Sequence, residues 1–125
     1  MPRTDRPQCL EGKTVKVRTG HGTLYVTVNW HPETGLPFEV FATLGKAGGC
    51  ESAHLEALTR LISVVLQHGI HPTEVISQLR QVTCHPYGMG GDIENTSPAD
   101  AIAHVLEGSY DGDKEDDEEA VTSRG

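Results

Sequence analysis

The sequence lacks the features of a membrane or secreted protein. None of its apolar runs approaches the ~20 residues that a membrane-spanning helix needs, and the first residues lack the apolar region of a signal peptide. We therefore expect a cytoplasmic protein that does not contact membranes. The three cysteines, Cys9, Cys50 and Cys84, are odd in number and irregularly spaced, which argues against a disulfide framework and leaves reduced thiols or metal ligands. Aromatic residues make up only 5% of the chain, so the core should be aliphatic.

Positive charge is also scarce. The formal net charge is -8, of which -5 falls on residues 111–125 and -3 on residues 1–110. Neither part offers the basic stripe that nucleic-acid binding requires, so direct binding of nucleic acid is not expected. The 125 residues suit one domain with a modest core. Composition predicts a flexible arm over residues 1–12, a folded domain over 13–108 and a disordered acidic tail over 109–125.

Alternating apolar residues predict three antiparallel strands. A turn at Gly20–Gly22 joins the first two strands into a hairpin, and the segment 30–37, which contains proline and glycine, leads to the third. The apolar positions are Val15 and Val17, then Leu24, Val26 and Val28, then Phe38, Val40, Ala42 and Leu44.

Three helices are expected after the strands. Apolar residues at three- and four-residue spacing predict a helix from near Glu51 to Gly69, with Gln67 off the apolar stripe. Pro72 and Ser97–Pro98 are start signals for two shorter helices. The inward residues should be Leu55, Leu58, Leu61, Ile62, Val65 and Leu66, then Val75, Ile76, Leu79 and Val82, then Ala101, Ile102, Val105 and Leu106. The predicted fold class is α+β, with a three-stranded antiparallel sheet packed against about three helices.

A glycine-rich bend between the third strand and the first helix is the candidate ligand site. Its residues are Gly45, Lys46, Gly48, Gly49, Cys50 and Glu51. Backbone N–H groups at a helix start, joined by a lysine, suit a small anion such as a nucleotide phosphate. The alternative is that the glycines only let strand and helix pack closely. Cys50, with His54 one turn further on, also suggests a small cysteine-dependent enzyme, although no third orienting group is evident.

The segment FEVFATLGKAGGCESAHLEALTRLISVVLQHGI, preceded by EGKTVKVRTGHGTLYVTVN, resembles the TSCPD domain over roughly residues 11–107. That domain is named for a Thr-Ser-Cys-Pro-Asp motif and occurs at the C-terminal end of adenosylcobalamin-dependent ribonucleotide reductases and in small free-standing proteins. The chain has no room for a reductase barrel or a cobalamin site, and no cysteine follows Cys84. The resemblance therefore implies a detached, non-catalytic accessory module, with a ribonucleotide reductase or a nucleotide-like ligand as its partner. A sheet with one helical layer also makes a homo-oligomer plausible.

The family pattern has cysteines after the double glycine, after the second helix and inside the naming motif. The first two are Cys50 and Cys84 here, but Thr96-Ser97-Pro98-Ala99-Asp100 stands where the motif would be, with Pro98 at the cysteine's place. One interpretation is zinc held by Cys50, Cys84 and His85, because structural zinc takes four Cys, His or carboxylate ligands. The other is two buried, inert thiols. The missing cysteine leaves a zinc site one ligand short unless His85 or another histidine substitutes.

Overall fold

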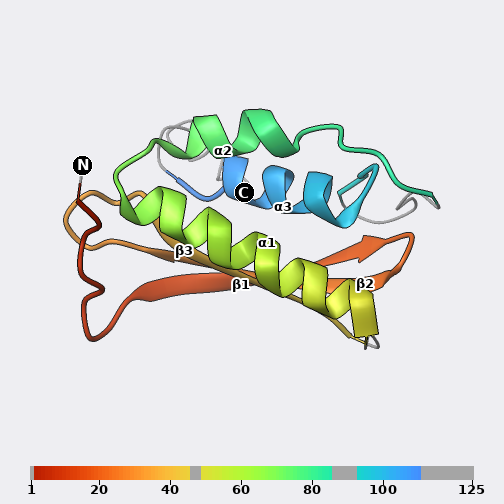
Figure 1. Cartoon of the computed structure of the whole chain (residues 1–125), viewed down its shortest axis with the longest axis horizontal. Coiled ribbons are helices and arrows are strands. Elements are labelled where there is room, and N and C mark those ends of the chain that lie inside the picture. Colours follow the sequence, from red (N-terminus) through yellow and green to blue (C-terminus); the bar gives the residue numbers. More distant parts are fainter. Residues whose placement is uncertain (1, 46–48, 86–92, 111–125) are drawn as a thin grey trace, which may run out of the picture.

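The computed structural model describes residues 2–45, 49–85 and 93–110. The elements are β1 (Glu11–Thr19), β2 (Gly22–Trp30), β3 (Pro37–Leu44), α1 (Gly49–Gln67), α2 (Pro72–Leu79) and α3 (Pro98–Glu107). The strands form one antiparallel sheet in the order β1-β2-β3, and the three helices lie on one side of it (Figure 1). The predicted α+β fold is confirmed.

The β1–β2 turn presents a histidine at the tip of the hairpin. Gly20 and His21 are the two turn residues between the paired Thr19 and Gly22. Thr19 Oγ1 accepts a hydrogen bond from the His21 backbone N–H at 3.0 Å and donates one to the Gly22 carbonyl at 2.8 Å. Gly22 has φ 118°, a conformation that glycine adopts without strain. These contacts fix the position of His21 near the start of α1.

The core lies between the sheet and the helices and is aliphatic, as the composition predicts. Two expected inward positions are wrong. Leu61 is 65% exposed because it lies off the buried stripe of α1, and Val82 is exposed because α2 ends at Leu79. The buried apolar cluster consists of Val17, Leu24, Val26, Val28, Val40, Ala42, Leu44, Leu55, Ile62, Leu66, Val75, Ile76, Leu79, Ala101, Ile102, Ala103, Val105 and Leu106.

Helix α1 supplies hydrogen bonds to the outer edge of β3. Ser63 Oγ accepts from the Val40 N–H at 3.0 Å and donates to the Val40 carbonyl at 3.2 Å. Gln67 Nε2 donates to the Phe38 carbonyl at 3.4 Å. An edge strand has unpaired backbone groups, and these side chains satisfy part of them. The expectation that Gln67 lies off the inward face is therefore wrong, because Gln67 is buried against this edge.

The segment before β1 contacts the end of α1 and β3. The Thr4 N–H donates to the Gln67 carbonyl at 2.8 Å, and Arg3 Nε donates to Gln67 Oε1 at 2.7 Å. Arg6 donates from Nε and Nη2 to the two carboxylate oxygens of Glu39, each at 2.9 Å. These contacts join the segment before β1 to the domain. The flexible arm stays a prediction.

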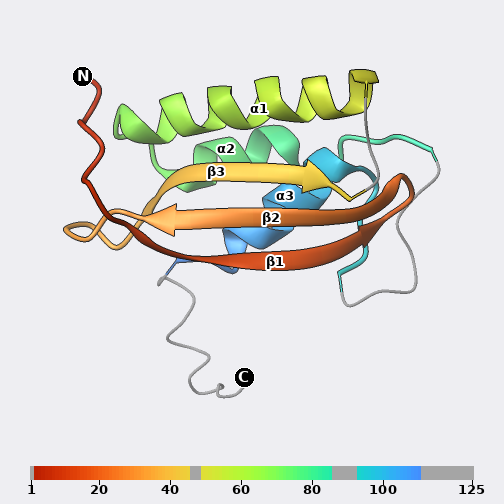
Figure 2. The same cartoon turned by 90° about the horizontal axis from the view of Figure 1, so that it is seen from below.

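None of the described helices covers the second face of the sheet (Figure 2). We call this surface the open face, and its central residues are Thr14, Lys16, Arg18, Tyr25, Thr27, Phe41 and Thr43. Phe41 is 52% exposed and Tyr25 is 39% exposed. Because Phe41 pairs with Thr27, two residues from Tyr25, the two rings are diagonal neighbours. Within the described residues, no helix is long and apolar enough to cross a membrane.

Candidate functional site: a pocket with two thiols

A cavity of about 280 Å³ lies where the β1–β2 turn, the end of β3 and the starts of α1 and α3 meet. We call it the thiol pocket, because two of the three cysteines line it. The lining residues are His21, Leu44, Cys50, Glu51, His54, Leu55, Leu58, Cys84, Ser97, Pro98 and Ala99. The pocket thus unites residues that are far apart in the sequence.

His21 connects a thiol to a carboxylate in the wall of this pocket. Its Nε2 lies 2.9 Å from Sγ of Cys84, and its Nδ1 lies 3.0 Å from Oε2 of Glu51. Thiol, imidazole and carboxylate in this order are the arrangement of a nucleophile, a base and an orienting group. The sequence places His21 only in a turn, and its contact with Cys84 spans 63 positions. No local signal could have predicted it.

The segment around residues 96–100 holds Cys84 in place. The Cys84 N–H donates to the Thr96 carbonyl at 2.8 Å. The Asp100 carboxylate accepts from the Gln81 N–H at 2.7 Å and from the Thr96 N–H at 3.0 Å. Ser97 Oγ accepts from the Asp100 N–H at 3.0 Å and caps α3. The threonine, serine and aspartate of the motif-like segment therefore fasten the loop after α2 to the start of α3.

Asp100 is charged although it is buried. Burial alone would raise its pKa, but hydrogen bonds from the Gln81 and Thr96 amides, with the charges of His104 and Arg80, outweigh this effect and lower the pKa below its ordinary value. Gln81 has φ 66°, which non-glycine residues adopt rarely. The hydrogen bond from its amide to Asp100 stabilises that conformation.

The sequence model of the TSCPD-domain family matches residues 1–110 of this chain. The chain belongs to the TSCPD-domain family. Vitamin B12-dependent ribonucleotide reductases of Streptomyces clavuligerus and Streptomyces coelicolor are 30% identical to it over 86 residues, which are 69% of this chain and 9% of each reductase. The similarly named protein of Streptantibioticus cattleyicolor is 29% identical over 86 residues, 14% of its length. The chain thus spans a small part of these relatives, and no solved structure matches it significantly.

The thiol pocket of this TSCPD domain unites Cys50, Cys84 and Pro98, the three positions at which the family pattern has cysteines. His85 is exposed and is not among the lining residues. Among the described residues, no group of three or more Cys, His, Asp or Glu could hold a metal. The 2.9 Å from His21 to Cys84 is also shorter than the about 3.6 Å between nitrogen and sulfur ligands of tetrahedral zinc. The described residues bring together no complete set of zinc ligands, so the expected zinc site is not confirmed and stays a prediction.

The glycine bend is described only in part. Lys46 and Gly48 lie outside the described residues, and the other predicted ligand-binding residues are exposed: Gly45, Gly49, Cys50 and Glu51. Gly49 has φ 64°, and beyond its chain neighbours and its own helix backbone no atom of the described residues lies within 4 Å of where a Cβ would be. The carboxylate of Glu51 contacts His21, so this start of α1 carries an acid beside the proposed anion site. Anion binding at the bend stays a prediction.

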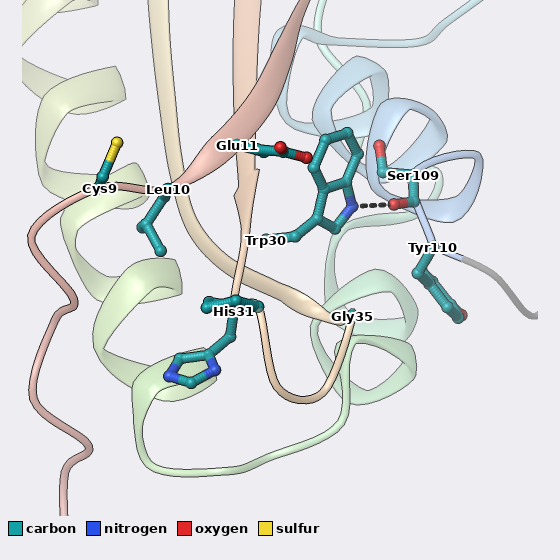
Figure 3. A pocket seen from close by; sticks show the side chains of 9 residues that line it. Cys9, Leu10, Glu11, Trp30, His31, Gly35, Ser109 and Tyr110 are labelled. Atoms are coloured by element: carbon teal, nitrogen blue, oxygen red, sulfur yellow. Dashed lines mark hydrogen bonds between the residues drawn. The ribbon is translucent and has the colours of Figure 1, made fainter.

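A second cavity, of about 600 Å³, lies at the opposite end of β2 and contains Trp30. Figure 3 shows the Trp30 indole between Glu11 and Ser109, with its Nε1 donating to the Ser109 carbonyl. Tyr110 meets the ring of His71 edge-on, with centroids 5.6 Å apart. Residues of β1 and residues of the segment after α3, which lie near opposite ends of the domain's sequence, thus meet in the wall of this cavity.

Proposed function

We propose that this TSCPD domain is an accessory module that binds the body of a ribonucleotide reductase and carries out no ribonucleotide reduction of its own. The observation that supports this proposal is the open face, where Phe41 and Tyr25 are exposed diagonal neighbours and none of the described helices covers them (Figure 2). In the relatives named as vitamin B12-dependent ribonucleotide reductases, the matching segment is 9% or 14% of a much longer chain. That longer chain is the natural occupant of such a face.

The side chains of the open face define the chemistry of its partner. Phe41 and Tyr25 offer an apolar centre, and exposed aromatic residues contribute strongly to protein–protein binding. Lys16 is the cross-strand neighbour of Tyr25, and Arg18 follows two residues later on the same face of β1. The partner surface should therefore have an apolar centre with acidic residues on the side of β1.

A charged substitution at the centre of the open face tests the proposal. The partner is the ribonucleotide reductase of the source organism, with its own matching segment removed where it has one, and affinity is measured by calorimetry. Phe41→Glu should weaken binding at least about tenfold, which corresponds to about 1.4 kcal/mol. Leu61→Glu, on the exposed side of α1, is the matched control and should bind like the unmodified chain. Equal effects of the two substitutions, or no binding by the unmodified chain, would contradict the proposal.

A second copy of this chain is the competing occupant of the open face. Sedimentation of the unmodified chain and of the Phe41→Glu variant distinguishes the two cases. A dimer that becomes a monomer on Phe41→Glu would assign the face to self-association, as the predicted homo-oligomer requires, and would overturn the reductase as its occupant. A species whose mass does not change on Phe41→Glu supports the reductase.

A further inference from the structure

We infer that the thiol pocket is a site of thiol–disulfide exchange, in which Cys84 attacks a disulfide and Cys50 completes the reaction. The sequence suggests chemistry at Cys50 with His54 as its base, but the structure shows His21 in contact with the thiol of Cys84. This inference concerns a different surface from the open face. It stands or falls independently of reductase binding.

Cys84 has the surroundings of an attacking thiol. A thiolate is the reactive form of cysteine, and His21 Nε2, at 2.9 Å from Sγ, is placed to accept the proton. The Glu51 carboxylate lies 3.0 Å from His21 Nδ1, and its negative charge favours the tautomer with the proton on Nδ1 and the lone pair of Nε2 toward Cys84. The imidazole is mostly buried, with 18% of the side chain exposed, so its orientation is held by its neighbours.

The remaining walls of the pocket favour a disulfide substrate with an apolar substituent. Five of the eleven described lining residues are leucine, proline or alanine: Leu44, Leu55, Leu58, Pro98 and Ala99. Acyl transfer would need hydrogen-bond donors aimed at an oxyanion. Disulfide exchange needs an attacking thiolate, a proton for the leaving thiolate and a second thiol. Cys50 lines the same pocket and precedes Glu51 on the first turn of α1, so the pocket contains all three groups.

The reaction balances with the disulfide as the oxidant. The proton of the Cys84 thiol moves to His21, and the thiolate attacks one sulfur of R–S–S–R, which breaks the sulfur–sulfur bond. The leaving thiolate takes the proton from the His21 imidazolium and departs as R–SH. The Cys50 thiol then attacks Sγ of Cys84, which releases the second R–SH and leaves a Cys50–Cys84 disulfide. The substrate gains two electrons, and the cysteine pair loses two.

Dithiodipyridine, a neutral aromatic disulfide whose released thione absorbs light, is the probe. The experiment uses the full chain with Cys9→Ser, so that the exposed Cys9 does not contribute. Both pyridine thiones should be released, the protein should retain no probe, and peptide mapping should find Cys50 joined to Cys84. Adding Cys50→Ser should stop the reaction after one release, with the probe bound to Cys84. Retention of one probe on each of Cys50 and Cys84, without a bond between them, would overturn the inference.

The role of His21 is tested by the rate of the first step in the chain that carries Cys9→Ser and Cys50→Ser. His21→Asn should slow the release at neutral pH at least about tenfold, because general bases contribute about 10²-fold or more. His31→Asn, in the loop after β2, is the matched control and should leave the rate unchanged. Glu51→Gln, at an exposed position, should give an intermediate rate, and it serves as the test should His21→Asn fail to fold. Equal rates for the His21 variant and its control would overturn the assignment.

Discussion

The two ends of the sheet differ in how their polar side chains are used. At one end, which we call the tied end, Arg6 binds Glu39 and Trp30 donates to Ser109, so distant segments are joined. At the other end, His21 and two cysteines face an apolar cavity. The comparison shows that long-range polar contacts stabilise the fold at the tied end, whereas at the thiol pocket such contacts place groups capable of chemistry.

Asp100 combines both roles, because it stabilises the fold and also places a residue of the thiol pocket. Like Glu39 at the tied end it is buried, but it accepts from two backbone amides and fastens the loop that carries Cys84. Its substitution should therefore change both the stability of the domain and the chemistry of the pocket. Substitutions at the tied end should change stability alone.

Asp100→Ala is expected to have the largest effect. It leaves the Gln81 and Thr96 amides without their acceptor, and two hydrogen bonds to a charged group support a loss of about 3 kcal/mol in unfolding free energy. Urea denaturation at neutral pH measures this loss. The reaction of Cys84 with dithiodipyridine should also slow, because its loop loses a fixed position. Asp100→Asn keeps one oxygen acceptor and should lose about half as much, and a loss below about 1 kcal/mol for the alanine variant would contradict this role.

Arg6→Ala tests the tied end through pH. The hydrogen bond from Arg6 is the main cause that lowers the pKa of Glu39 below its ordinary 4.5, against the effect of burial and with help from Asn29. A lowered carboxyl pKa stabilises the fold above pH 4.5, and this contribution is lost as the pH falls through the folded-state value. The variant should therefore be less stable than the unmodified chain at neutral pH, and the difference should shrink in acid.

Urea denaturation at neutral pH and below pH 4.5 measures that difference for Arg6→Ala. Arg18→Ala, on the open face, is the control and should show no such narrowing. The rate at which Cys84 reacts with dithiodipyridine should be the same in both variants, because neither residue lines the thiol pocket. A difference that stays constant with pH would contradict the role of the Arg6–Glu39 pair.

The strands and helices could be predicted because their signals are local. Alternation marks the strands, and Ser97 with Pro98 marks the start of α3 at the residue where the structure has it. The site could be predicted only in part. The family pattern pointed to Cys50 and Cys84, but the contact of His21 with Cys84 depends on the hairpin tip meeting the loop after α2. Buried Gln67 was missed for the same reason, since its partners lie on β3 and on the segment before β1.

Pro98→Cys is expected to change stability least and yet to alter what the thiol pocket binds. Pro98 lines the pocket beside Cys50 and Cys84, so the substitution adds a third sulfur where the family pattern has one. After incubation with zinc and dialysis, the variant should retain about one equivalent and the unmodified chain less than about a tenth, because three thiolates and one further ligand complete a tetrahedral site. Pro98→Ala removes the proline without adding sulfur and should behave like the unmodified chain. If Pro98→Cys and Pro98→Ala retained the same amount of zinc, the absence of a third thiolate would not be the reason that the pocket does not bind zinc. The thiol pocket would then be distinguished from the tied end by the groups that it already contains, the Cys50 and Cys84 thiols and the His21 imidazole.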